Sequence, residues 1–354
     1  MAVSVSPVFG QAKINTETAS FLNLPYSAEN AALGECGTTI ISEQAPMYNP
    51  GALGLYYLDR QASLSLILPH DMLNNFTLKN GSVGIRIPSS LLFGDSRNHV
   101  LALGYNRVSL STDWIPVIIY EPGTVPDSVP AFRGDERAQF VTIGFGYSGA
   151  MQIGIGASYI EIDERYSDLK ASAKTISLGL IAKRPMLLGG DDSRQSFYQI
   201  TPTFGLAYLY ATGSMTVLGT DYDLPKRFNW GFSVEIARRV KNRTPLALEL
   251  MIERQSKPGG YHNDFFHLGS ELGLFETFYL RIGRTEDDGH YHTTYGGAFS
   301  LSGLANLITH NGRGDSSNRN RSILGRLDFV YSYGNHNYVP FNEKAYHQFS
   351  ISLK

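Results

Sequence analysis

The 354-residue chain contains no apolar run long enough for a membrane-spanning helix. Its longest runs, such as 115–120, end in turn-forming residues, whereas a membrane helix needs about 20 apolar residues in succession. Cysteine is nearly absent too: Cys36 is the only one, so no intramolecular disulfide can form. These absences exclude a helical membrane protein and a disulfide-stapled scaffold.

Charge is also scarce, since charged residues make up 18% of the chain against about a quarter in average soluble domains. The formal net charge of −2 leaves no basic excess to neutralise phosphates, so we predict no nucleic-acid partner. Gly-Xaa-Ser-Xaa-Gly, Walker and dinucleotide-binding fingerprints are missing as well. We therefore expect neither an enzyme nor a cofactor.

What the sequence does contain is hydrophobic alternation with period two. In 227–236, five apolar residues (Phe228, Trp230, Phe232, Val234 and Ile236) alternate with residues that are mostly polar or small. Similar alternation recurs in 246–253, 277–282 and 348–353. Successive side chains of a strand point to opposite faces, so each segment predicts a strand between an apolar and a polar environment. A soluble sandwich would show the same alternation.

Two features favour a membrane barrel. Many segments run for about 9–15 residues, longer than the usual 5–6 of globular strands and suited to tilted membrane spans. Several connections are tight, at 148–149, 241–243 and 275, while others, such as 114–137 and 212–226, are long enough for external loops. The connection 304–321 is long where this scheme expects a short turn.

We therefore predict an all-β fold, a transmembrane antiparallel β-barrel of about fourteen strands. The predicted strands are 61–68, 82–89, 99–113, 138–147, 150–161, 170–184, 196–211, 227–240, 244–256, 265–274, 276–284, 291–303, 322–334 and 345–354. The expected location is a bacterial outer membrane. Because the first ten residues lack the basic and apolar regions of a signal peptide, we expect that peptide to have been removed from this sequence.

Residues 1–60 do not alternate like the rest, so we predict two parts: an N-terminal hatch over 1–60 and a barrel over 61–354. We expect Asn49-Pro50-Gly51 to form a type II turn with Gly51 at positive φ. Gly34 and Gly37 would let the hatch bend tightly in a narrow lumen. Tyrosines near predicted strand ends, including Tyr208, Tyr210, Tyr331 and Tyr333, suit an interfacial aromatic girdle.

The N-terminal region resembles the PorV/PorQ family, a branch of the FadL-like outer-membrane barrels. The residues that carry the resemblance are Phe21, Leu22, Pro25, Ser27, Ala28, Leu33, Gly34, Asn49, Pro50 and Gly51. Two positions depart from the family pattern: Gly51 interrupts the Asn-Pro-Ala order, and Glu35 replaces a second glycine. The close match covers about 35 residues.

The resemblance implies a fourteen-stranded barrel with a luminal hatch and a role in type IX protein secretion. The implied partners are outer-membrane lipid, other secretion-system or envelope proteins, and secreted cargo domains docking on the long loops. The alternative is a FadL-like channel for hydrophobic small molecules such as fatty acids. We expect the lumen to carry Glu235, Glu249, Glu253, Arg281, Arg326 and Asp328, too much charge for a long apolar conduit.

One cluster could suggest a metal site. His290 and His292 would share a strand face beside Asp287 and Asp288. Polar residues gather in such loops anyway, so we predict no metal site there.

Overall fold

The computed structural model describes most of the chain. The described residues are 19–71, 76–88, 98–116, 131–166, 169–188, 196–217, 219–240, 243–256, 264–287, 290–309, 326–336 and 344–354. Among them, no helix is long and apolar enough to cross a membrane.

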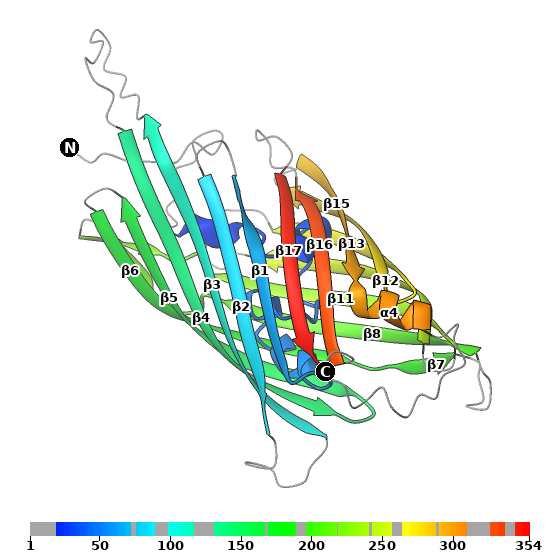
Figure 1. The fold of residues 1–354 in the computed structure, drawn as a ribbon. Coiled ribbons are helices and arrows are strands. Elements are labelled where there is room, and N and C mark those ends of the chain that lie inside the picture. The colour runs from blue at the N-terminus through cyan, green and yellow to red at the C-terminus, as the bar shows by residue number, and fades with distance from the viewer. Residues whose placement is uncertain are drawn as a thin grey trace.

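Fourteen antiparallel strands close into a barrel, as predicted (Figure 1). The ring runs β1-β2-β3-β4-β5-β6-β8-β11-β12-β13-β14-β15-β16-β17, and β17 pairs with β1 to close it. The ring strands are β1 (Ala62–Asp71), β2 (Phe76–Ile87), β3 (His99–Pro116), β4 (Ala131–Ser148), β5 (Gln152–Tyr166), β6 (Leu169–Lys183) and β8 (Ser196–Leu209). The others are β11 (Arg227–Val240), β12 (Arg243–Ser256), β13 (Phe265–Leu274), β14 (Phe278–Asp287), β15 (His290–Ser300), β16 (Leu327–His336) and β17 (Lys344–Leu353).

Each predicted strand overlaps one ring strand, but β2 and β4 begin about six residues earlier than predicted. Three short strands were not predicted: β7 (Met186–Leu188), which pairs with β8, and the hairpin of β9 (Ser214–Val217) and β10 (Thr220–Asp223). The connection 304–321 contains the end of α4 (Leu301–Thr309), at the same end of the barrel as the C-terminus (Figure 1).

We call the end with the C-terminus and the turn 149–151 the turn end, and the opposite end, with 117–130, the loop end. Connection lengths do not separate the two ends as predicted. The turn end also has the long connections 88–98 and 184–195, and the loop end has a two-residue one at 167–168. Orientation in the membrane therefore stays a prediction.

The outer face of the barrel carries a broad band of exposed apolar side chains. They come from strands all around the ring and include Leu64, Val83, Leu103, Ile143, Ile155, Leu178, Phe232, Leu250, Ile282 and Phe349, each 39–56% exposed to solvent. A closed barrel satisfies its backbone hydrogen bonds within the wall, so this band suits hydrocarbon.

The alternation reverses toward the loop end of β2–β6. On β3 the outward side chains change from the apolar Leu103 to the exposed Arg107, while the inward ones become the buried Val108 and Leu110. Here the wall is polar outside and apolar inside, as in a soluble protein. The prediction that apolar side chains face outward and polar ones inward thus fails for this zone, because these strands extend past the apolar band.

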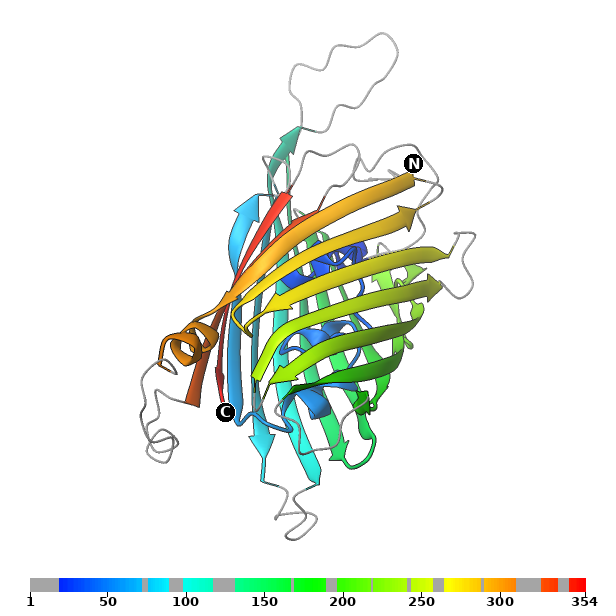
Figure 2. The ribbon, with the colours of Figure 1, turned by 90° about the vertical axis from the view of Figure 1, so that its right-hand side faces the viewer.

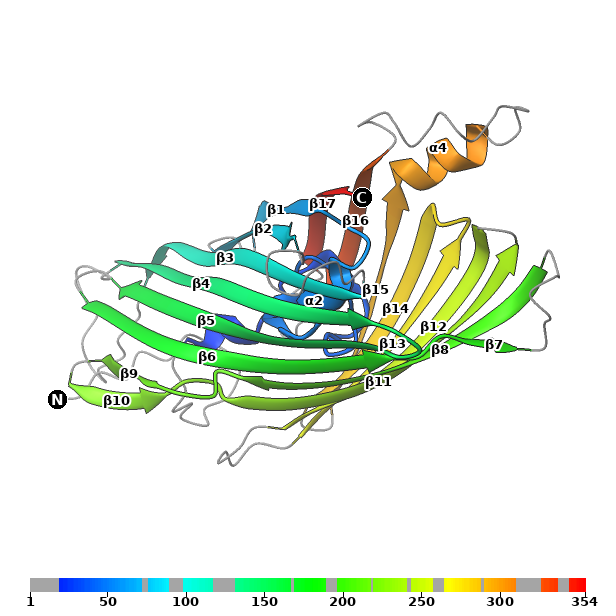
Figure 3. The same ribbon diagram turned by 90° about the horizontal axis from the view of Figure 1, so that it is seen from below.

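Residues 19–60 lie inside the barrel (Figure 2). This hatch has four short helical elements: η1 (Ser20–Asn23), α1 (Ala28–Ala32), η2 (Ala45–Met47) and α2 (Ala52–Tyr56). Seen from the turn end, it lies among the strands of the ring (Figure 3). Most of its side chains are buried, among them Phe21, Leu22, Tyr26, Leu33 and Met47.

Candidate functional site: the hatch and the lumen

The hatch folds through local polar caps and tight bends. Ser27 caps α1, because its Oγ accepts a hydrogen bond from Asn30 N at 2.9 Å. Gly34 then takes the left-handed conformation at φ +64°, as the predicted bend requires. The expected type II turn at Gly51 is wrong: Gly51 has φ −62° and precedes α2, and its N–H donates to Asn49 Oδ1 at 3.0 Å.

Gly51 is needed for space and not for its φ. A Cβ there would lie 2.8 Å from the carbonyl carbon of Gly179 and 2.9 Å from Gly154 O. Inward-facing glycines give the hatch backbone similar access all around the wall; they are Gly144, Gly146, Gly154, Gly156, Gly179, Gly205, Gly283 and Gly334. Each would place a Cβ within 3 Å of a hatch atom, so the hatch backbone is in direct contact with much of the wall.

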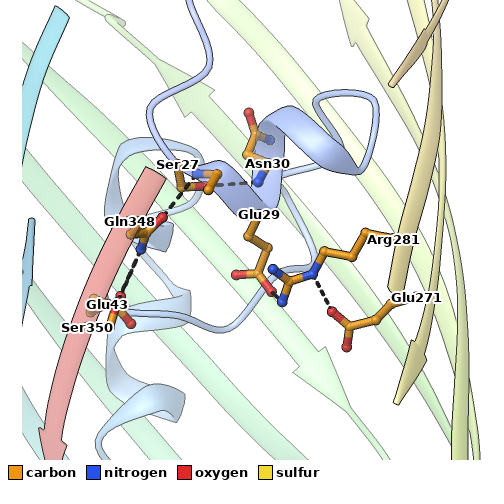
Figure 4. A network of polar contacts seen from close by, with 9 residues as sticks. Ser27, Glu29, Asn30, Glu43, Glu271, Arg281, Gln348 and Ser350 are labelled. Carbon is orange, nitrogen blue, oxygen red and sulfur yellow. Dashed lines mark hydrogen bonds and ion pairs between the residues drawn. The ribbon is translucent and has the colours of Figure 1, made fainter. Parts of the chain in front are cut away.

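An ion triad joins α1 to β13 and β14 (Figure 4). The Arg281 guanidinium contacts Glu29 Oε1 at 2.7 Å and Glu271 Oε2 at 2.6 Å. Because two carboxylates share one guanidinium, the triad carries a negative charge. Burial raises the pKa of Glu29 to about 7, with further upward shifts from Glu271 and Glu43 that oppose the effect of Arg281.

Glu253 holds the hatch backbone directly. Its Oε2 accepts hydrogen bonds from Gly37 N at 2.7 Å and Thr38 N at 2.8 Å, and its Oε1 accepts one from Asn229 Nδ2. Two amides directed at one carboxylate make a charge-assisted anchor.

Strand β17 contributes a further anchor (Figure 4). Gln348 on β17 accepts a hydrogen bond from Ala28 N at 3.0 Å and donates one to Glu43 Oε1 at 3.1 Å. Ser350 also donates to Glu43. The hatch is thus tied to β12, β14 and β17 by polar side chains.

The predicted lumen charges fall into three groups. Glu253 and Arg281 bind the hatch, whereas Glu235 and Glu249 line a polar cavity of about 410 Å³ together with Lys183 and Arg239.

Asp328 and Arg326 do not belong to the hatch contacts. Asp328 sits at the turn end, where it accepts hydrogen bonds from Ser300 and Ser302 and pairs with Lys354. Arg326 is exposed there and donates to Lys354 O, so it lies outside the buried lumen set. Arg326 precedes β16, so the alternation of side chains along a strand does not apply to it.

Sequence reasoning missed the apolar side of the lumen. Its inward residues on β2–β6 are Leu78, Val108, Leu110, Ala138, Phe140, Ile160, Ile162 and Ala173, and they pack against Phe21, Leu22 and Tyr26 of the hatch. The signal was present as the phase reversal within β3 and β4. This change was not recognised because each strand was assumed to have one apolar face along its whole length.

Two smaller expectations concern aromatic and metal-binding residues. Tyr210 does not join a girdle: it is buried, packs in the same core as Phe21, and lies beneath the Arg227 guanidinium. No group of three or more His, Cys, Asp or Glu residues suited to a metal ion occurs among the residues described. Asp288 of the suspected cluster lies outside them.

Comparisons with known proteins find similarity in architecture alone. No protein-family model and no curated protein matches the chain. The Pseudomonas putida toluene transporter TodX shares 10% identity at a TM-score of 0.42, over 92% of this chain and 96% of TodX. A Pseudomonas aeruginosa FadL homologue shares 10% sequence identity at a TM-score of 0.38, over 93% of this chain and 98% of the homologue. CdiB from Acinetobacter baumannii shares 11% sequence identity with this chain at a TM-score of 0.40. The aligned region includes 83% of this chain and 60% of CdiB.

At such low identities and TM-scores, these similarities say nothing of what this chain binds. The PorV/PorQ resemblance gains no support from them.

Proposed function

We propose that this protein is an outer-membrane passage for small hydrophobic molecules such as fatty acids, closed here by its hatch. It acts as a passage and not as an enzyme. The observation that carries this proposal is the apolar inner wall of β2–β6, covered by Phe21, Leu22 and Tyr26 of the hatch. The predicted lumen charges Glu235, Glu249, Glu253 and Arg281 lie on β11, β12 and β14 and leave most of this wall apolar, although Glu136 and Glu164 are buried on β4 and β5.

The two sides of the lumen contact the hatch in different ways. The polar side holds the hatch through Glu253 and Arg281. The segment 19–26 packs its side chains against the apolar side, and its carbonyls at Leu22 and Tyr26 accept hydrogen bonds from Arg227 and Asn80. A hydrophobic molecule that displaced this segment would replace one apolar contact by another, so the inner wall would stay out of water. Displacing only the segment 19–26 therefore costs less free energy than displacing the whole hatch.

The wall also has a weak seam beside this region. Among the described residues, pairing between β1 and β17 ends at Ile67 and Gln348. Beyond that point β1 has a register shift and contains Pro69, which cannot donate a backbone hydrogen bond. A seam of this kind suits lateral exchange of an apolar molecule with the membrane.

A single substitution tests which part of the hatch must move. A Cβ built on Gly269 of β13 would lie 3.4 Å from Cys36 Sγ and 2.9 Å from Leu33 O, so Gly269→Cys brings two thiols within reach of a disulfide once the hatch backbone shifts slightly. Because Cys36 precedes Gly37, which Glu253 holds on the polar side, we expect oxidised Gly269→Cys to keep its uptake of a radiolabelled long-chain fatty acid.

Gly269→Ser is the matched control, since it adds a side chain of similar size and no bond. Its uptake should not respond to oxidant or reductant. Loss of uptake by fully cross-linked Gly269→Cys would refute opening of one side of the hatch, and uptake by neither form above that of membranes without the protein would refute the passage.

A second candidate is a PorV/PorQ-like component of type IX secretion that binds cargo or other envelope proteins. It is favoured by β3 and β4, which have 18 residues each and so are about 60 Å long. At the usual tilt of barrel strands they rise about 45 Å, well beyond an apolar band of about 25 Å. The protruding wall offers a large polar surface. Affinity purification from native membranes tests this candidate: recovery of secretion components supports it, and recovery of none counts against it.

A further inference from the structure

A hollow of about 880 Å³ opens on the outer face of β1–β5, toward the loop end. Its apolar part is lined by Leu64, Leu66, Val83 and Tyr105, which are 36–51% exposed and belong to the membrane-facing band. Gly81 faces outward next to Leu66 and has no side chain to fill the space. These strands lie side by side in Figure 1.

The other part of the hollow is strongly basic. Its cations are Lys79, Arg107, Arg137 and Arg165, one on each of the successive strands β2, β3, β4 and β5. Asp135 is the one carboxylate in the lining, and it pairs with Arg137. The cations begin where the apolar band ends, within one or two outward positions of Val83 and Tyr105.

We infer that this hollow binds a phosphorylated lipid of the adjacent leaflet. Its acyl chains would lie along Leu64, Leu66 and Val83, and its phosphates would contact the four cations. Arginine guanidinium groups bind phosphate oxygens in pairs of parallel hydrogen bonds, and lysine acts as a mobile point charge. At the edge of hydrocarbon such contacts are less screened than in bulk water.

The spacing of the cations favours a lipid with two phosphates. Neighbouring strands lie about 4.8 Å apart, so Lys79 on β2 and Arg165 on β5 originate about 14 Å apart along the sheet. A single phosphate cannot contact both ends of such a row. A headgroup with two separated phosphates can, and the wide apolar floor accommodates several chains.

A soluble acidic protein segment fits the hollow less well. It would satisfy the cations but would leave Leu64, Leu66 and Val83 in contact with its polar backbone. An amphiphile matches both parts of the lining at once. This inference does not depend on what passes through the lumen.

The test compares lipids with the same chains and different phosphate numbers. Detergent-purified protein is titrated with bisphosphoryl, monophosphoryl and dephosphorylated lipid A, and complexes are counted by native mass spectrometry. We expect affinity to fall in that order and to weaken with added salt. Inorganic phosphate alone should not compete at the same concentration.

Lys79→Gln/Arg107→Gln should weaken binding of the bisphosphoryl form by about tenfold or more, since a hydrogen bond to a charged group is worth roughly one power of ten. Lys174→Gln/Arg254→Gln is the matched control: it also removes two exposed outer-face cations, both away from the hollow. The control should bind like the wild type.

Equal affinity for the dephosphorylated lipid would overturn the inference. So would equal losses in the two double variants, or stronger competition by a soluble acidic peptide than by the lipid. Both variants must show the same unfolding temperature as the wild type, which excludes misfolding as the cause of a loss.

Discussion

At the scale of single residues, glycine determines how closely the hatch contacts the wall. Gly34 illustrates this twice: its φ of +64° favours glycine, and a Cβ there would lie 2.5 Å from Arg284 N. Gly283 faces it from β14, and a Cβ on Gly283 would overlap the Gly34 backbone. Backbone meets backbone here, so neither partner can move aside as a flexible side chain would.

We predict that Gly283→Ala loosens the hatch without preventing barrel formation. Overpacking of this kind costs about 1–3 kcal/mol, and the hatch can move where the wall strand cannot. The rate at which a neutral maleimide labels Cys36 should rise. Gly273→Ala, whose Cβ would lie 3.4 Å from the Tyr279 ring, is the control. Equal labelling rates in the two variants would contradict the prediction.

Cys36 itself should be a poor nucleophile in the folded protein. It is buried beside Leu33, Ile40 and Met251, and burial raises the pKa of its thiol well above the usual value, with smaller upward shifts from nearby carboxylates. Less thiolate is then present at pH 8, so we expect slow iodoacetamide labelling that becomes fast in denaturant. In Cys36→Ser/Ser214→Cys the thiol lies on an exposed strand and should react quickly in both states. Fast labelling of native Cys36 would refute the burial.

At the scale of elements, short helices dock through charges that strands supply. Helix α1 has five residues, too few to be stable alone, and it is held by Arg281 on one side and Gln348 on the other. The triad of Glu29, Arg281 and Glu271 has two carboxylates and one guanidinium, and all three side chains are mostly buried. Protonation of Glu29 relieves this excess of negative charge.

We therefore predict that Glu29 makes the folded state more stable at low pH. Folding raises the pKa of Glu29 from 4.5 to about 7, so its contribution is fully present below pH 4.5 and is lost as the pH rises through 7. The unfolding temperature of the wild type minus that of Glu29→Gln should fall between pH 5 and pH 8. A difference that stays constant, or rises, would show that Glu29 is already ionised in the folded protein.

At the scale of the whole molecule, the barrel is a closed wall around a fitted plug. Polar side chains of β12, β14 and β17 bind the hatch, and wall glycines let the hatch backbone contact β4, β5, β6 and β8. Displacing the whole hatch would break charge-assisted bonds on the polar side. Moving the segment 19–26 would break apolar contacts and two hydrogen bonds, from Arg227 to Leu22 O and from Asn80 to Tyr26 O.

We expect the intact protein to conduct ions poorly in planar bilayers because the hatch fills the lumen. Removal of residues 1–60 should give steady conductance, since the polar groups of β11–β14 would then line a water-filled path. The heat-dependent mobility of folded barrels on gels serves as the folding control. Steady conductance of the intact protein, equal to that of the truncated one, would show that the hatch does not seal it.

Strand number and position could be read from the sequence because alternation is a local property. Residues 227–240 and 265–274 were predicted to the residue, since one face of each is apolar except at Arg238 and Ser270. The start of β4 was missed because Asp135 and Arg137 lie on the same outward face as Val141 and Ile143, so this face changes from polar to apolar along the strand. A change of environment along one strand cannot be recognised from a pattern that assumes one environment.

The sequence by itself determined an all-β chain of about fourteen strands, because period-two alternation is a local property, and the length of these strands favoured a barrel over a sandwich. Only the tertiary structure decided what the interior does. The neighbours of Gly51 and Gly283, the partners of Glu29 and Glu253, and the apolar wall around Phe140 all involve residues distant in the chain. Contacts of that kind depend on how the ring closes around the hatch, and no local pattern encodes them.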